Sequence, residues 1–223
     1  MILLSFNTKD NVINMVSLSR AAYVAIPGHG NKRLNAAHAY GGANLLVETV
    51  EQNYKIKVDR YVTVNFDGFQ NIVDILGGVS ISMSAKEARI IVGKSSGGTY
   101  RLNGEQAMAF ARLRSIDTDR DRTGRQRKLL NAMAAELRKV SVTQLFKLLD
   151  EFLPLVTTNF TKTELVKQMT NVPSYLRYSV KEAVIPHNYV PLTMRDGKEV
   201  LILDWDETNA YIHELLYPGM VPD

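Results

Sequence analysis

Cysteine is absent from the chain of 223 residues, so neither a disulfide nor a thiolate zinc site is available to it. The four histidines, at positions 29, 38, 187 and 213, show no H-E-x-x-H or other metal spacing. No run of about 18 apolar residues occurs, so the sequence contains no candidate for a membrane-spanning helix. These absences exclude a disulfide-stapled scaffold and a zinc enzyme of familiar ligand spacing.

Two common enzyme signatures are missing as well. A "GKS" begins at Gly93, but the first glycine of a GxxxxGK[ST] phosphate-binding loop would fall on Ala88. No G-x-S-x-G nucleophile elbow is present. The composition is ordinary for a globular protein, and the net charge of +4 allows an anionic ligand without requiring one.

Strand and helix patterns interleave along the whole chain. Two apolar runs separated by "NTKDN" predict a hairpin over 1–19, and "AIPGHGNKRLN" predicts a loop. Asn103 and the pair Thr161/Glu164 are typical of helix N-termini. We predict an α/β fold, a three-layer α-β-α sandwich with a central mixed, mostly antiparallel-edged sheet, in a single domain over 1–223. Further helices are expected over 43–54, 67–78, 122–140, 143–153 and 207–217, and strands over 58–66, 79–84 and 199–205.

The segment 110–130, "FARLRSIDTDRDRTGRQRKLL", is unusually rich in arginine. The helix that follows it shows an apolar stripe at spacings of three and four, and steps of four backwards from this stripe reach Gln126 and then Arg122. We therefore predict that Arg122 and Gln126 face a pocket at a helix N-terminus, where they would donate hydrogen bonds to an anion. The alternative, that they only cap the rim of the core, stays open. The stripe consists of Leu130, Met133, Leu137 and Val140.

The other arginines of this segment divide into two groups. Arg112 and Arg114 lie two residues apart, so in extended backbone they would point the same way and converge with Arg122 on one diphosphate. Arg20, directly after a strand, could join them, because ligands of α/β sheets gather at strand carboxyl ends. The aromatic residues over 61–69 are interpreted as core. We interpret the remaining arginines as solvated or paired with Asp117, Asp119 and Asp121; these are Arg120, Arg125 and Arg127.

Five ordered stretches resemble the LytR–CpsA–Psr family over nearly the whole chain. They are "MILLSFNTKDNVINMVSLSR", "IPGHGNKRLNAAHAYGG", "DRYVTVNFDGFQNIVDILGGVSI", "RLNGEQAMAFARLR" and "DRTGRQRKLL". The last stretch matches the R-x-x-R-Q signature of the family. One such motif would be weak evidence, but five in the right order and separation are specific.

The resemblance implies an extracytoplasmic bacterial phosphotransferase that moves a glycopolymer, such as teichoic acid or capsular polysaccharide, from a polyprenyl-pyrophosphate carrier to peptidoglycan. It implies an apolar lipid channel, Mg²⁺ as cofactor, and anchoring on the cell membrane through an N-terminal helix upstream of Met1. Arg20 and Arg122 would be catalytic. The residues implied to hold the pyrophosphate are Arg20, Arg112, Arg114, Arg122, Arg125 and Gln126.

Two departures from the family pattern bear on activity. The acidic magnesium ligands of the family are expected in a segment before the first strand, upstream of Met1, and Ala21 stands where an aspartate usually follows the arginine of "SLSR". We expect this chain to bind lipid yet turn over poorly. A non-catalytic lipid-binding module is therefore one alternative. A transcriptional regulator that binds nucleic acid is another, which the aspartates among the arginines disfavour.

Overall fold

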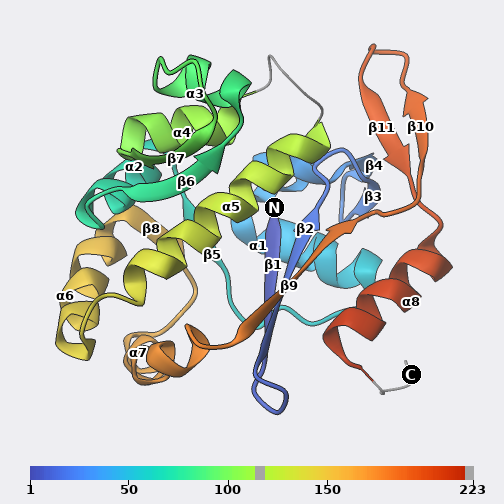
Figure 1. Cartoon of the computed structure of the whole chain (residues 1–223). Helices are drawn as coiled ribbons and strands as arrows, with labels where there is room; N and C mark the ends of the chain where they lie inside the picture. The colour runs from blue at the N-terminus through green and yellow to red at the C-terminus, as the bar shows by residue number, and fades with distance from the viewer. Residues whose placement is uncertain (114–118, 219–223) are drawn as a thin grey trace. The chain divides into compact units, whose positions relative to one another are not determined.

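The computed structural model describes residues 1–113 and 119–218, except for the side chains of 119–122. The chain forms two compact units: unit 1 comprises Met1–Tyr61 and Tyr178–Asp223, and unit 2 comprises Val62–Arg177 (Figure 1). Helices and strands occur in both units, so the α/β class is confirmed. That the two units act as a single domain stays a prediction. Within the described residues, no helix has the length and apolar character needed to cross a membrane.

Unit 1 is built on a mixed three-stranded sheet, in the order β1 (Ile2–Asn7), β2 (Val12–Leu18) and β9 (Ser179–Ile185). β1 pairs antiparallel with β2, and β2 pairs parallel with β9. The predicted opening hairpin is confirmed. The Asn7 side chain closes its turn by accepting hydrogen bonds from the backbone N–H groups of Lys9 and Asp10.

The core of unit 1 lies between this sheet and two helices, α1 (Leu34–Tyr54) and α8 (Trp205–Leu216). β2 is buried along most of its length, as expected of a central strand. α1 is broken at Gly42, whose φ of 64° favours glycine. The Tyr54 ring packs edge-on against Trp205 at 5.3 Å, and complete burial raises the pKa of Tyr54.

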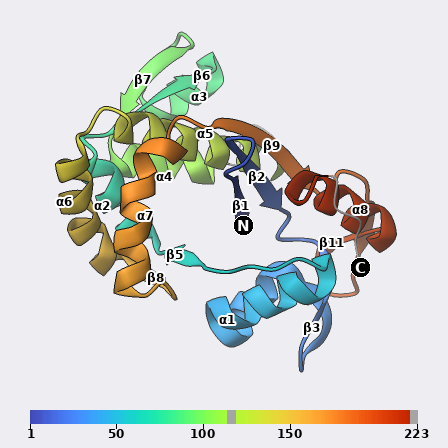
Figure 2. The same ribbon diagram turned by 90° about the horizontal axis from the view of Figure 1, so that it is seen from below.

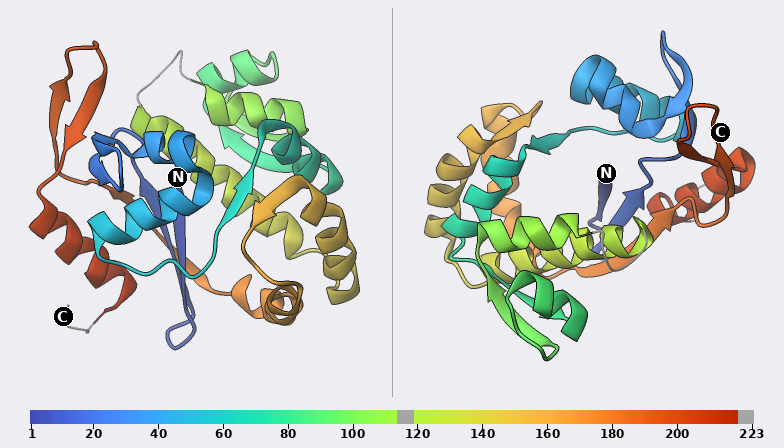
Figure 3. Two further views of the ribbon diagram at one scale, coloured as in Figure 1. Left: turned by 180° about the vertical axis from the view of Figure 1, so that it is seen from behind. Right: turned by 90° about the horizontal axis from the view of Figure 1, so that it is seen from above.

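Two small hairpins complete unit 1: β3 (Tyr23–Ile26) with β4 (Gly30–Arg33), and β10 (Val190–Thr193) with β11 (Glu199–Ile202). Figure 3 shows the β10–β11 hairpin extending beyond the rest of the unit. The prediction of a plain loop over 25–35 is wrong, because Gly28 and Gly30 take positive φ values and turn this stretch into a hairpin.

Unit 2 packs helices against the antiparallel pair β6 (Val79–Met83) and β7 (Gly98–Leu102) (Figure 2). Its core joins these strands to α4 (Gly104–Arg112) and α5 (Asp119–Leu137). The remaining elements are β5 (Val62–Val64), α2 (Phe66–Ile75), α3 (Ala85–Ile91), α6 (Val142–Phe152), η1 (Leu153–Leu155), β8 (Val156–Thr158) and α7 (Lys162–Tyr175).

The helix starts of unit 2 follow local rules that the sequence displays. Asn103 accepts a hydrogen bond from the backbone N–H of Gln106, and the Gln106 side chain accepts one from the N–H of Asn103. Thr161 and Glu164 form the same reciprocal box at the start of α7. Both predicted N-caps are confirmed.

Candidate functional site

Arg125 is the buried centre of the arginine-rich segment. Although it carries a charge, only 2% of the residue is exposed. One terminal nitrogen of its guanidinium donates to the Leu113 carbonyl at 2.5 Å, and the other lies 3.5 Å from a Glu87 carboxylate oxygen. The guanidinium also lies 5.9 Å from the centre of the Phe110 ring. The interpretation of Arg125 as solvated is therefore wrong, and its pairing with the loop aspartates, whose side chains lie outside the described residues, stays a prediction.

The partners of Arg125 are themselves fixed in place. Glu87 closes the N-terminal capping box of α3 by accepting from the backbone N–H and the hydroxyl of Ser84. Leu113 is the C-cap of α4, so Arg125 places a positive charge at a helix C-terminus, where it is favourable. Leu113 is also the last described residue before 114–118. Arg125 thus fixes the backbone that leads into Arg114.

The buried stripe of α5 differs from the one that the sequence predicts. Its residues with at most 8% exposure are Arg125, Leu129 and Glu136, and Ala132 and Met133 pack beside them. Leu130 and Leu137 are only half-buried, and α5 ends before Val140. The prediction chose the phase with the most apolar residues, whereas the buried stripe of the described side chains begins at Arg125 and ends at Glu136, both charged.

Arg112 lies at the rim of unit 2 in an environment opposite to that of Arg125. It is exposed at the last position of α4, and its guanidinium carbon lies 4.5 Å from the centre of the Phe66 ring. Because Arg112 is helical, the expectation of extended backbone at this residue is wrong. Phe66 is 58% exposed, so its interpretation as a core residue is also wrong. The sequence contains no local signal that separates Phe66 from the neighbouring Phe69, which packs against the core.

An exposed apolar row leads to Phe66. Val62 and Val64 lie on one face of β5, since side chains alternate along a strand, and they are 61% and 39% exposed. Phe66, two residues further on, is the first residue of α2. Unit 2 therefore presents three uncovered apolar side chains in sequence, with a guanidinium over the ring of the last one.

Arg20 belongs to unit 1 and lies two residues beyond the end of β2, as predicted for a residue at a strand carboxyl end. Its carbonyl accepts from the backbone N–H of Asn35, and the next carbonyl, of Ala21, accepts from the N–H of Leu201 in β11. Arg20 is thus held between α1 and the β10–β11 hairpin. Because Arg20 and the other predicted arginines lie in different units, their convergence stays a prediction.

Three predicted site residues remain: Arg114, Arg122 and Gln126. Arg114 lies outside the described residues. The backbone of Arg122 is in the first turns of α5, but its side chain is also outside them. Gln126, one residue after Arg125, is half-buried on the flank of the stripe.

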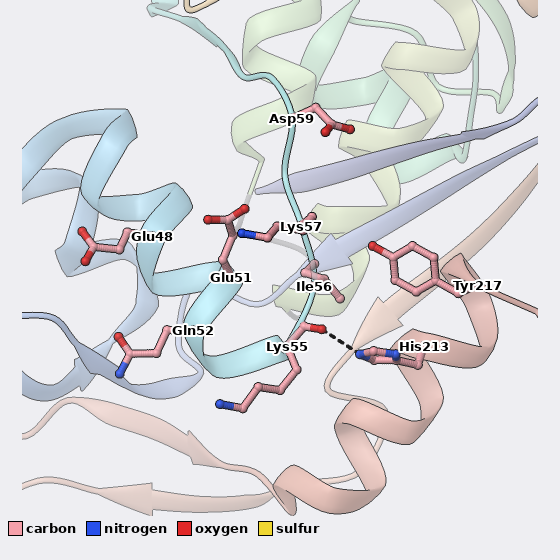
Figure 4. A pocket seen from close by; sticks show the side chains of 9 residues that line it. All are labelled: Glu48, Glu51, Gln52, Lys55, Ile56, Lys57, Asp59, His213 and Tyr217. Atoms are coloured by element: carbon pink, nitrogen blue, oxygen red, sulfur yellow. Dashed lines mark hydrogen bonds between the residues drawn. The ribbon is translucent and has the colours of Figure 1, made fainter. Parts of the chain in front are cut away.

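The described part of unit 1 contains a polar hollow, shown in Figure 4. His213 of α8 and Lys55, the C-cap of α1, meet there: the imidazole Nε2 lies 2.7 Å from the Lys55 carbonyl oxygen, so Nε2 carries the hydrogen that is donated. Three carboxylates and two ammonium groups are among the groups that line the hollow, which is unlike the apolar channel that the sequence predicts. Its lining residues are Glu48, Glu51, Gln52, Lys55, Ile56, Lys57, Asp59, His213 and Tyr217.

Comparison with known proteins decides the family. Residues 1–215 match the model of the LytR_cpsA_psr family. The chain belongs to this family. It is 37% identical over 147 residues to the polyisoprenyl-teichoic acid–peptidoglycan teichoic acid transferase TagT of Bacillus subtilis (strain 168), an alignment that covers 63% of this chain and 46% of that protein. The resemblance drawn from the five sequence stretches is confirmed.

Solved structures of the family agree with the fold. The crystal structure of B. subtilis TagT matches with a TM-score of 0.79 at 27% identity and covers 96% of this chain and 84% of that chain. A structure of the LytR-CPS2A-psr family protein YwtF (TagT) with bound octaprenyl pyrophosphate lipid matches with a TM-score of 0.73 at 26% identity, covering 96% and 83%. The chain spans about half the length of the first curated relatives that it matches.

Proposed function

We propose that this protein binds a glycan linked to a polyprenyl diphosphate and transfers the glycopolymer to peptidoglycan. The observation that carries the proposal is the exposed Arg112 guanidinium over Phe66, at the end of the apolar row Val62, Val64 and Phe66. A polyprenyl diphosphate has the same two chemical parts, an apolar tail and an anionic head. Relatives named as teichoic acid transferases, and a TagT structure that holds octaprenyl pyrophosphate, support it.

The apolar tail would lie along the exposed row of β5. Apolar surface gains about 25 cal/mol for each Å² that it buries, so a long prenyl chain on uncovered valines and a phenylalanine is favourable. The diphosphate would then reach Arg112, whose planar guanidinium can donate two parallel hydrogen bonds to phosphate oxygens. The family's apolar lipid channel begins, in this proposal, at these side chains.

In the proposed transfer, a hydroxyl of peptidoglycan attacks the phosphorus atom that carries the glycopolymer. The new P–O bond forms as the P–O bond to the polyprenyl phosphate breaks, the hydroxyl proton leaves to solvent, and polyprenyl phosphate is released. Such reactions depend mainly on positioning and on neutralising charge on the phosphate oxygens. We assign neutralisation to Arg20, Arg112, Arg114 and Arg122, with Gln126 as a further donor.

The family resemblance implies that Arg125, in the R-x-x-R-Q signature, holds the pyrophosphate. This proposal gives Arg125 a different role. Its described contacts are to protein groups, Leu113 and Glu87. We therefore propose that Arg125 is a positioning residue, which holds the C-terminus of α4 so that Arg112 and Arg114 are presented to the diphosphate.

Mg²⁺ belongs to the proposal through the family resemblance. Among the described residues, no three His, Asp or Glu side chains gather where they could hold a metal ion. The steps above do not depend on a bound metal ion. Location on the extracytoplasmic face of the bacterial membrane is likewise proposed from the family.

The test is a direct binding measurement with the chain of 223 residues and a short-chain polyprenyl diphosphate in detergent, with and without Mg²⁺. We expect saturable binding that competes with excess inorganic pyrophosphate, and a loss of at least about tenfold in affinity for Arg20→Ala. Transfer of glycan to peptidoglycan fragments is measured in parallel. Binding without transfer would identify a lipid-binding module. Salt-dependent binding to duplex DNA, with no binding of the lipid, would favour the regulator instead.

A further inference from the structure

The outer strand of the β10–β11 hairpin carries an uncovered apolar surface. Tyr189, Val190 and Leu192 are 47%, 67% and 49% exposed. Val190 and Leu192 share one face of the hairpin with Val200 and Ile202, which stand opposite them on β11. Val200 is buried, at 2% exposure. The apolar face of the hairpin is therefore buried at Val200 of β11 and exposed to solvent along β10.

The tip of the same hairpin is charged. Arg195 is exposed, and the Lys198 ammonium lies 2.6 Å from a carboxylate oxygen of Asp196. The pKa of Asp196 is lowered first by its hydrogen bonds from Lys198, with a smaller contribution from the charge of Arg33, so Arg33 of β4 lies near the tip. Three cations therefore accompany two carboxylates, Asp196 and the exposed Glu199, beside the apolar face, which leaves an excess of one positive charge there.

The backbone of β10 argues against a second copy of the chain as the occupant. The Met194 N–H donates to the Lys198 carbonyl, so Met194 and Lys198 are a hydrogen-bonded pair. Hydrogen-bonded and non-hydrogen-bonded pairs alternate along an antiparallel ladder, so Pro191 and Leu201 are a non-hydrogen-bonded pair. Their backbone groups therefore point away from each other. Pro191 therefore stands where the free edge would offer an N–H, and it has none. Proline at an exposed edge prevents pairing with another strand.

We propose that the β10–β11 hairpin docks on the surface of an anionic lipid bilayer, with Val190, Leu192 and the Tyr189 ring among the headgroups and Arg195 and Lys198 on lipid phosphates. Aliphatic and tyrosine side chains next to basic residues are the combination that binds such an interface. The hairpin is joined to the backbone beside Arg20 through the Leu201–Ala21 hydrogen bond. Docking would bring Arg20 close to lipid headgroups, and in this respect the inference rests on the proposed function.

The experiment measures co-sedimentation of the chain with vesicles of equal parts phosphatidylglycerol and phosphatidylcholine, and with vesicles of phosphatidylcholine alone. We expect partitioning at least about tenfold stronger on the anionic vesicles, and weaker at high salt. V190T/L192T should reduce this partitioning at least about tenfold, and R195Q/K198Q should remove most of its salt dependence. The control is V142T/V166T, which alters two valines of unit 2 that are 49% and 52% exposed, and which should partition like the unchanged chain.

Binding of short-chain polyprenyl diphosphate in detergent separates this inference from the proposed function. V190T/L192T should bind that lipid normally and unfold at an unchanged temperature. Lipid binding in detergent without any vesicle partitioning would overturn the docking inference and leave the proposed function standing. The docking inference would also be overturned if V190T/L192T and V142T/V166T partitioned equally onto the anionic vesicles. So would a hairpin variant that changes only self-association or only retention on peptidoglycan, since the occupant would then be another copy or the glycan.

Discussion

Arg112 and Arg125 lie on consecutive helices of unit 2, yet their surroundings are opposite. Arg125 is 2% exposed and has a carbonyl and a carboxylate as partners, whereas Arg112 is exposed and has an aromatic face beneath it. A buried guanidinium needs protein acceptors because it has lost water. An exposed guanidinium over a ring keeps its N–H groups available to a ligand. Arginines of one sequence cluster therefore differ in role: Arg125 holds protein groups in place, whereas Arg112 is available to a ligand.

The largest expected effect comes from Arg125→Ala. Removing one partner leaves the Glu87 carboxylate uncompensated in the core, so we expect the free energy of unfolding to fall by about 3–5 kcal/mol. Urea denaturation measures this loss. Arg127→Ala is the control and should change the free energy of unfolding by less than about 0.5 kcal/mol.

A second variant checks the cause of that loss. Replacing Arg125 and Glu87 together by methionine removes both charges, and should recover much of the stability. If Arg125→Ala instead leaves stability intact and abolishes only lipid binding, Arg125 is a ligand contact and the division between the two arginines fails.

Arg112→Ala should have the converse effect. We expect the affinity for polyprenyl diphosphate in detergent to fall by about 10- to 100-fold, because a charge-assisted, bidentate contact is lost. The free energy of unfolding should change by less than about 1 kcal/mol, since only a cation–π contact and a helix-end charge disappear. Titration calorimetry and urea denaturation give the two quantities.

Two controls sharpen this prediction. Arg112→Lys keeps the charge but not the planar fork, so its affinity should lie between those of the unchanged chain and the alanine variant. Phe66→Leu keeps an apolar side chain but removes the ring face, and should weaken binding by only a few-fold. A loss of stability at Arg112 as large as that at Arg125 would refute the comparison.

The smallest effect concerns Glu136, the charge at the other end of the buried stripe. It accepts from Arg101 at 2.6 Å and from Lys139 at 2.8 Å. Burial raises its pKa, but the hydrogen bonds from Arg101 and Lys139 outweigh burial, so the net pKa is below the ordinary value. Because both partners are largely exposed, Glu136→Gln should cost only about 1 kcal/mol at pH 7.

The pH dependence of Glu136→Gln follows from the direction of that shift. The lowered pKa in the folded state means that the ionised carboxylate stabilises the fold above its unfolded pKa of about 4.3, and that this contribution is lost as the pH falls through the folded pKa. The difference in stability between the two proteins should be constant from about pH 6 to 8 and shrink below about pH 4. A difference that grows in acid would show that Glu136 has a raised pKa.

The sequence by itself determined the features that depend on neighbours along the chain. The Asn7 turn and the caps at Asn103 and Thr161 were predictable, because each closes within three residues. The family was predictable from motif order. The strand end that carries Arg20 was also predictable, because the apolar run of β2 stops just before it.

Only the tertiary structure decided which face of α5 is buried and which arginine is exposed. Arg125 can enter the core because Glu87, 38 positions away, and Leu113, 12 positions away, are brought to it by the fold. Phe66 is uncovered although its neighbour Phe69 is packed. Periodicity assigns apolar residues to the interior and charges to water, but burial of a charge depends on partners that the fold supplies from distant parts of the chain.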